Sequence, residues 1–176
     1  MVYKFHSDKK RYFQLQSNTS KNYILPFIGS KTWENEFVLE VGCAEGAVLS
    51  SFLEAGAQGL GIELNPHRVN LAQNFLENYI EKGQVEVIAK NIYDFDFEDV
   101  LDTKPSLIVL KDVIEHIPNQ EKLVPRLMNM LAPGGRIFFA FPPWQMPFGG
   151  HQQVCDNKLL SVLPYFHLLP RNVYKW

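Results

Sequence analysis

A glycine-containing turn between an apolar segment and an amphipathic segment is the part of this sequence best suited to chemistry. The run VLEVGCAEGAVL covers residues 38–49, and Glu40, Gly42, Ala44 and Gly46 follow one another at two-residue intervals. The two glycines permit backbone conformations that a side chain would forbid, and they let a ligand approach the main chain closely. The free amides at the start of the following helix add the positive end of a helix dipole.

An acid stands at the matching point of the next apolar segment. Glu63 follows residues 59–62, seventeen positions after Gly46. A carboxylate at the end of a neighbouring strand can accept hydrogen bonds from both hydroxyls of a ribose. The dinucleotide pattern G-x-G-x-x-G is not met, because Gly46 stands at the fifth position and Ala44 at the third. The spacing therefore favours an adenosyl group cradled by the turn, although a turn and an acid that bind nothing are the competing interpretation.

Apolar and amphipathic segments alternate along the chain, which indicates an α/β fold with a parallel sheet and right-handed crossovers. We expect strands at residues 37–41, 59–62, 85–89, 106–110 and 137–141, and helices around residues 20–28, 47–55, 65–83, 119–131 and 157–165. Asn65 and Asn119 are expected to cap their helices, and Pro125 to kink the second one or delay its start. Ligands of such sheets bind beyond the carboxyl ends of the strands, beside the first strand.

The bulk composition is that of an ordinary single domain. The chain has 176 residues, 46% of them hydrophobic, and a formal net charge of −2. This balance gives no bias toward nucleic acid or anionic membranes. The charge is uneven, since residues 1–31 carry six Lys or Arg and one acid. We read this basic segment as a solvated arm, with anion binding as the alternative.

Cysteine and hydropathy patterns suggest a cytoplasmic location. Cys43 and Cys155 are too few to form a disulfide framework, no apolar run approaches 18 residues, and the amino-terminal residues are polar. His151 and Cys155 have the spacing of half a metal site, but no second pair accompanies them, so no metal is expected.

Four motifs resemble a known family when taken in order. VLEVGCAEG, GIELN, KDVIEHIP and MLAPGGRIFFAFP resemble the consecutive motifs of class I S-adenosylmethionine-dependent methyltransferases, most closely the ubiquinone-biosynthesis type of small-molecule enzymes. The resemblance covers residues 37–141. It implies a Rossmann-like three-layer α/β/α sandwich with strand order 3-2-1-4-5, S-adenosyl-L-methionine as cofactor, and a small-molecule methyl acceptor.

The resemblance also implies roles at matching positions. Gly42, Ala44 and Gly46 would line the methionine and ribose side of the cofactor. Glu40 would orient its ammonium group, and Glu63 would hold its ribose hydroxyls.

Further positions follow the other strands. The adenine side would be formed by Leu64, Asn91 and Ile92, where Asn91 replaces the usual Asp but still offers an acceptor oxygen. Lys111 and Asp112 would lie beside the reactive sulfonium. His151 and Asp112 are, in that order, the candidate catalytic residues, and His116 is a third candidate that is read mainly as structural.

Two departures from the family pattern concern the turn and the end of the chain. Ala44 replaces a glycine, and the family's sixth and seventh strands have no counterpart in residues 142–176. We divide the chain into an arm (1–35), a cofactor-binding core (36–141) and a loop-rich segment (142–176) that is either remodelled or part of a longer protein. Its aromatic residues, with Tyr12 and Phe13, are expected either to form a lid over an apolar acceptor or to pack on the sheet edge.

The main function predicted is methyl transfer by in-line displacement. One alternative is an enzyme that uses the same site for aminopropyl transfer or nicotinamide chemistry. The other is a non-catalytic or truncated methyltransferase-fold module that binds cofactor or a protein partner. The oligomeric state is not readable from the sequence.

Overall fold

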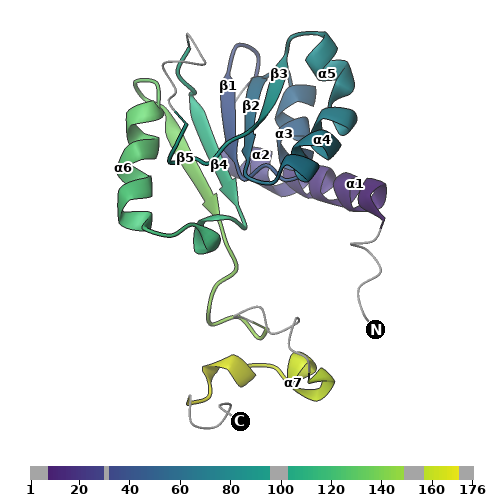
Figure 1. Cartoon of the computed structure of the whole chain (residues 1–176), viewed down its shortest axis with the longest axis vertical. Coiled ribbons are helices and arrows are strands. Elements are labelled where there is room, and N and C mark those ends of the chain that lie inside the picture. Colours follow the sequence, from purple (N-terminus) through teal and green to yellow (C-terminus); the bar gives the residue numbers. More distant parts are fainter. Residues whose placement is uncertain (1–7, 30–31, 96–102, 149–156, 171–176) are drawn as a thin grey trace. The chain divides into compact units, whose positions relative to one another are not determined.

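Five strands form a single sheet in the order β3-β2-β1-β4-β5 (Figure 1). Their bounds are β1 (Phe37–Val41), β2 (Gln58–Glu63), β3 (Val85–Ala89), β4 (Leu107–Lys111) and β5 (Arg136–Ala140). The pairs β1–β2, β1–β4 and β2–β3 are parallel. The computed structural model describes residues 8–29, 32–95, 103–148 and 157–170, and divides into two units, residues 1–139 and 140–176.

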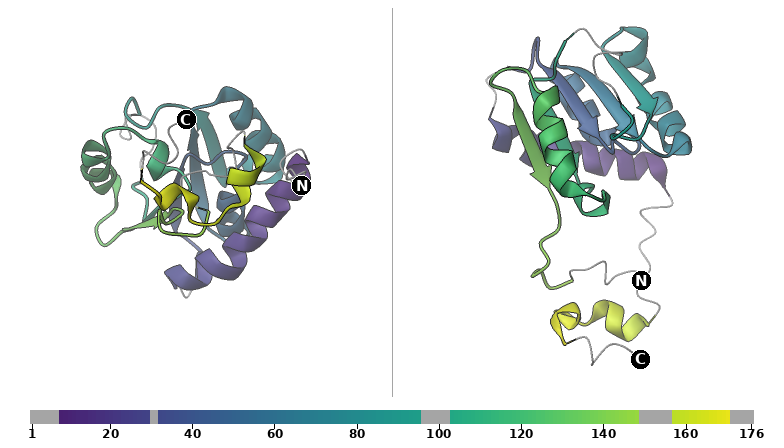
Figure 2. Two further views of the ribbon diagram at one scale, coloured as in Figure 1. Left: turned by 90° about the horizontal axis from the view of Figure 1, so that it is seen from below. Right: turned by 60° about the vertical axis from the view of Figure 1, so that its left-hand side comes forward.

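Helices cover both faces of the sheet (Figure 2). One face carries α1 (Lys9–Thr19), the π-helical η2 (Ser20–Ile24), α2 (Leu25–Ile28), α3 (Ala47–Glu54), α4 (Pro66–Phe75) and α5 (Glu77–Glu81). The other carries η3 (Ile114–His116) and α6 (Gln120–Met130). The predicted class, the three layers and the strand order are confirmed.

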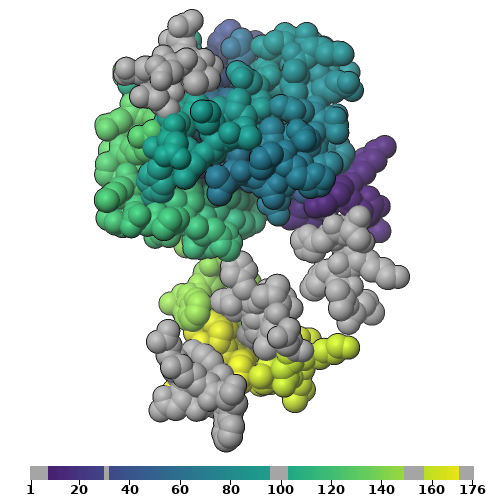
Figure 3. Space-filling model, in the orientation of Figure 1, coloured from purple at the N-terminus to yellow at the C-terminus, as the bar shows by residue number. Residues whose placement is uncertain are grey.

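The core has two parts, one on each face of the sheet. Val38 packs with Phe52 of α3 and Ala72 of α4, whereas the next residue, Leu39, packs in the cluster that contains Leu127 of α6. Successive side chains of a strand point to opposite faces, so a strand covered on both sides needs consecutive apolar residues. In the space-filling view of Figure 3, the blue, teal and green segments of this unit form a continuous surface.

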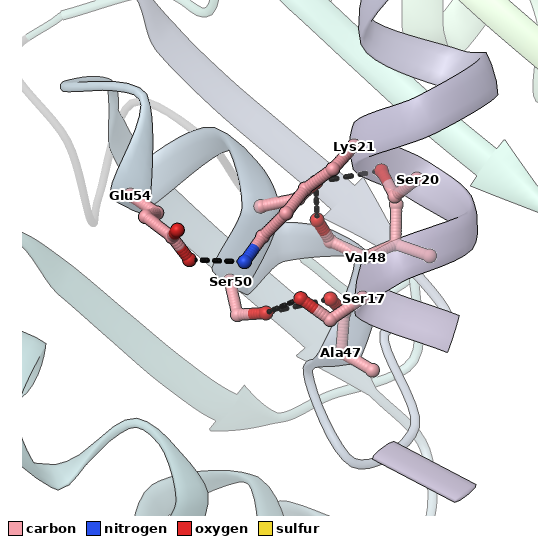
Figure 4. Close-up of polar contacts among 8 residues, drawn as sticks. Ser17, Ser20, Lys21, Ala47, Val48, Ser50 and Glu54 are labelled. Carbon is pink, nitrogen blue, oxygen red and sulfur yellow. Dashed lines mark hydrogen bonds and ion pairs between the residues drawn. The ribbon is translucent and has the colours of Figure 1, made fainter. Parts of the chain in front are cut away.

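Hydroxyl groups join the amino-terminal helices to α3 (Figure 4). The Ser51 hydroxyl donates to the Val48 carbonyl at 2.6 Å, and it lies 2.6 Å from the Ser20 hydroxyl, from which it therefore accepts. Beside this pair, the Ser50 hydroxyl donates to the Ser17 hydroxyl at 3.0 Å. All four serines are buried. Small polar side chains thus replace large apolar ones at this contact.

Several helix predictions were wrong in detail. The amino-terminal helix begins at Lys9, well before residue 20, and the predicted helix over residues 65–83 is divided at Leu76, whose ψ is 8°. Pro125 lies inside α6 and does not delay its start, and Asn119 has a φ of 54° with no side-chain cap bond. Asn65 does cap α4, because its side chain accepts from the His67 amide.

The second unit contains α7 (Lys158–Val162) and the short η5 (Phe166–Leu168). Asn157 caps α7 by accepting from the Leu159 amide. The ring of Trp144 meets that of His167 edge-on, with 5.3 Å between centroids. The described residues of this unit contain no complete strand beyond the end of β5. The division of the chain at residues 35 and 141 stays a prediction, as does the lid. No helix in the described ranges is long and apolar enough to cross a membrane.

Packing between β2 and the turn after β1 leaves no room for a side chain at Gly61. A Cβ there would lie 2.7 Å from Cys43 Sγ. We expect Gly61→Ala to lower the free energy of unfolding by about 1–3 kcal/mol, as overpacked cores do. Cys43→Ala in the same background removes the sulfur and should recover part of that loss in urea denaturation. A double variant no more stable than Gly61→Ala would contradict this account.

Candidate functional site

The turn after β1 depends on three residues in the left-handed backbone region. Gly42, Ala44 and Gly46 have φ values of 71°, 50° and 78°. At Gly42 a Cβ would lie 2.6 Å from a Val113 methyl carbon, so the backbone of the turn passes directly under the segment after β4. The Gly42 amide donates to the Ile62 carbonyl at 2.7 Å, which ties the turn to β2. Only glycine meets both demands at Gly42.

Glu63 fastens the end of β2 to the same turn. Its Oε2 accepts from the Ala44 amide and its Oε1 from the Asn65 amide, each at 2.9 Å. The residue is only 8% exposed. A carboxylate has about four acceptor positions, so each oxygen retains capacity for another donor. Glu63 is therefore held in place by the backbone while it can still bind hydroxyl groups.

Glu40 is a buried acid beneath the turn. Its Oε2 accepts from the Leu49 amide in α3 at 2.9 Å, and the residue is 4% exposed. Burial raises the pKa of Glu40 to about 8, against the opposing effects of the Leu49 hydrogen bond and the Lys111 charge. In the ligand-free protein this carboxyl group is mainly protonated at neutral pH, and a cation placed beside it would favour the charged form.

Two adjoining cavities lie beyond the carboxyl ends of β1, β2 and β4. They measure about 150 and 410 Å³ and share the lining residues Gly42, Arg68, Asp112 and Val113. A third cavity of about 430 Å³ lies against the edge strand β3 and contains none of the predicted site residues. The paired cavities occupy the position beside β1 where the topology predicts a ligand.

The smaller cavity has polar walls. It is lined by Tyr12 and Gln16 of α1 and by Glu40, Cys43, Ala44, Glu45, Ala47, Val48 and Lys111, besides the shared residues. Lys111 forms an ion pair with its neighbour Asp112, whose φ is 54° and whose side chain is 56% exposed. Asp112 therefore has a solvent-exposed side chain at the boundary between the two cavities.

The larger cavity is more apolar. Its lining includes Glu63, Leu64, Asn91, Ile92 and His116. Asn91 Oδ1 accepts from the Tyr93 amide at 3.0 Å, and Arg126 of α6 donates to the Ile92 carbonyl at 2.8 Å. These bonds fix the loop after β3. The Asn91 oxygen, which is predicted to accept from an adenine amine, thus also accepts a hydrogen bond that stabilises its own loop.

The structure brings nine of the eleven predicted site residues together around these cavities. The two others are Gly46 and His151. Gly46 does not line either cavity: a Cβ there would lie 2.7 Å from Leu76 Cδ1, so this glycine permits close packing of the turn on the end of α4. His151 lies outside the described residues.

Sequence reasoning missed Gln16, Glu45 and Arg68. Glu45 lies within the glycine turn, and Arg68 lies in the first turn of α4, four positions after the predicted site residue Leu64, so proximity in sequence was an available signal for both. Gln16 had no such signal, because only the packing of α1 brings it to the site. Of the aromatic pair considered for a lid, Tyr12 does line the smaller cavity, whereas Phe13 stacks on Phe75 at 4.5 Å.

No cluster of three or more His, Cys, Asp or Glu side chains suited to a metal ion occurs within the described residues. The chemistry available is that of backbone amides, buried carboxyl groups and a few cations around two joined cavities. A doubly wound sheet with such a site at its switch point is the arrangement in which open α/β proteins bind ligands.

Comparison with known proteins identifies the family. Residues 17–161 match the model of the methyltransferase domain, and the chain belongs to this family. It is 24% identical over 115 residues to a ubiquinone biosynthesis O-methyltransferase of Coxiella burnetii, and 28% identical over 123 residues to an uncharacterized methyltransferase of Mycobacteroides abscessus. These matches cover 62% and 65% of this chain but only 44% and 43% of the relatives. The chain thus spans less than half the length of these relatives.

Solved structures share the fold. Magnesium protoporphyrin IX methyltransferase (ChlM) from Synechocystis PCC 6803, with bound SAM, superposes with a TM-score of 0.59 at 18% identity, covering 81% of this chain and 65% of that one. The SAM-bound amino pentose methyltransferase CalS10 from Micromonospora echinaspora gives 0.55 at 20% identity, covering 74% and 51%. At these identities the likeness shows the fold.

The raised pKa of Glu40 predicts a pH-dependent cost in stability. Because the folded-state pKa of Glu40 lies above the ordinary value of 4.5, the folded protein holds this proton more tightly than the unfolded chain. The resulting contribution to the free energy of unfolding is complete below about pH 4.5 and is lost as the pH rises to about 8. Glu40→Gln keeps an acceptor for the Leu49 amide but cannot ionise. As the pH rises through this interval, the free energy of unfolding of Glu40→Gln should increase relative to that of the wild type by up to about 1.4 kcal/mol per pH unit. Parallel urea-denaturation profiles from pH 5 to 8 would contradict the prediction.

Proposed function

We propose that this chain binds S-adenosyl-L-methionine and transfers its methyl group to a small-molecule acceptor. The observation that carries the proposal is the pair of joined cavities, with the Gly42 backbone at their junction and the Glu63 carboxylate on one wall. Membership of the methyltransferase domain family and the SAM-bound structures that share the fold support it.

The residues present fit this cofactor. Gly42 leaves main-chain atoms at the junction, where φ and Val113 together forbid a side chain. Glu63 is positioned to accept from the ribose hydroxyls, and Leu64, Asn91 and Ile92 would hold the adenine in the more apolar cavity. Glu40 would face the ammonium group from the smaller cavity, where burial makes the acid responsive to a cation. Ala44 and Lys111 would complete this methionine side.

The chemistry supplied by the bound cofactor is a methyl group on a positively charged sulfur. The chain's own part is to bind, orient and exclude water, which supplies several kcal/mol in reactions of this kind. Asp112, at the boundary of the cavities, is the candidate to orient the acceptor or receive its proton. His151 is the second candidate for that role.

A nicotinamide dinucleotide is the less suitable ligand. Its pyrophosphate calls for closely spaced glycines with a third at the sixth position. Here Ala44 carries a methyl group in the turn, and Glu40 and Glu45 place two buried acids near it. Acids at this position favour a cation over a pyrophosphate.

Calorimetric titration with S-adenosylmethionine, S-adenosylhomocysteine and NAD tests the cofactor class. We expect the two sulfur nucleosides to bind and NAD not to bind. Glu63→Gln should weaken S-adenosylmethionine binding by about 1–3 kcal/mol, because one ribose hydroxyl loses its charged acceptor. This variant is preferable to Glu63→Ala, since the amide oxygen can still accept from the Ala44 or Asn65 amide.

A matched control separates the general effect of removing one negative charge from the specific effect of changing a residue in the site. Glu86→Gln removes an exposed acid from β3, outside both cavities, and should leave the affinity unchanged. Tight NAD binding, or equal affinity of wild type and Glu63→Gln for S-adenosylmethionine, would contradict the assignment. A screen of small molecules for methyl acceptance would then identify the acceptor.

A further inference from the structure

One wall of the smaller cavity comes from α1, and an ion pair fastens the first turn of that helix. Tyr12 and Gln16 supply the wall. Lys9 precedes them by three and seven positions and therefore lies on the same face of α1. Its Nζ lies 2.8 Å from Oε1 of Glu45. This contact joins the first turn of α1 to the turn after β1.

The acid of this pair belongs to the glycine turn itself. Glu45 follows Ala44, whose amide donates to Glu63. The Glu45 side chain is 6% exposed, whereas that of Lys9 is 47% exposed. Burial alone would raise the pKa of Glu45, but the hydrogen bond and charge of Lys9, with a smaller effect of Arg68, hold it below its ordinary value. The buried carboxylate therefore depends on Lys9 for its compensation.

α1 buries little apolar surface. Ser17 is the buried residue of this helix, and Leu15 is 51% exposed. Phe13, stacked on Phe75, is partly buried, and the Ser50 hydroxyl of α3 donates to the Ser17 hydroxyl. Helices that bury little apolar surface open locally at a low cost in free energy. A polar contact at the first turn of such a helix has a large influence on how often the helix is docked.

We propose that Lys9 and Glu45 are positioning residues for the adenosyl site: their ion pair docks α1 against the glycine turn and sets the fraction of molecules in which the smaller cavity is complete. The inference rests on the proposed function, since it assigns a role in cofactor binding. Apparent affinity falls in proportion to the competent fraction, so removal of the Lys9 ammonium weakens binding although Lys9 itself does not line the cavity.

The test combines calorimetry with hydrogen exchange on the full chain. Lys9→Ala should speed exchange of α1 amides in the ligand-free protein and raise the Kd for S-adenosylmethionine roughly fivefold. Lys9→Arg should restore both values.

A second ion pair on the same interface provides the matched control. Lys21 pairs with Glu54 of α3, and neither residue lines the two cavities (Figure 4). Lys21→Ala should leave the Kd unchanged. An equal rise in Kd for Lys21→Ala and Lys9→Ala would overturn the specific role of Lys9, as would wild-type exchange and affinity in Lys9→Ala.

The two proposals fail in different ways. If the wild type does not bind S-adenosylmethionine, the proposed function is wrong, and so is the role of Lys9 and Glu45 in cofactor binding. The exchange data would still report whether Lys9 docks α1. If the wild type binds and Lys9→Ala binds equally well, the proposed function stands and only the positioning role is wrong.

Discussion

The site depends on the hydrogen bonds that Glu63 accepts from the backbone of two different segments. One oxygen holds the Ala44 amide in the turn after β1, and the other holds the Asn65 amide at the start of α4. A carboxylate that accepts backbone amides is oriented without help from a ligand. The turn, the end of β2 and the first turn of α4 therefore form one rigid corner, and both cavities open from it.

The electrostatics of this corner follow from its burial. Glu40, Glu45 and Glu63 are all nearly inaccessible, yet each accepts a hydrogen bond from a backbone amide or from Lys9. In a region of low dielectric, unpaired acids would be costly, so each carboxyl group has a fixed donor. The three acids differ in consequence. Glu40 has its pKa raised by burial, while Lys9 lowers that of Glu45. A cationic ligand is thus favoured beside Glu40 in particular.

Much of the fold was readable because its signals are local. Consecutive apolar residues predicted the buried strands, and Asn65 followed by Pro66 predicted the start of α4. The errors arose where packing overrides local preference. Leu76, fully buried, divides the helix predicted over residues 65–83, and Pro125 is accommodated within α6. A side chain's burial and a helix's contacts with the sheet depend on distant residues, which no local pattern contains.

The sequence by itself determined the identity of the residues in the turn, and the resemblance of its motifs to a known family implied the strand order. It did so because the backbone demands at Gly42 and the acid after β2 are set within short segments. Only the tertiary structure decided that Gly46 serves packing against Leu76, that Asn91 also holds its own loop, and that α1 supplies a cavity wall fastened by Lys9. These features are contacts between segments far apart in the chain, and their geometry exists only once the sheet and its helices have packed together.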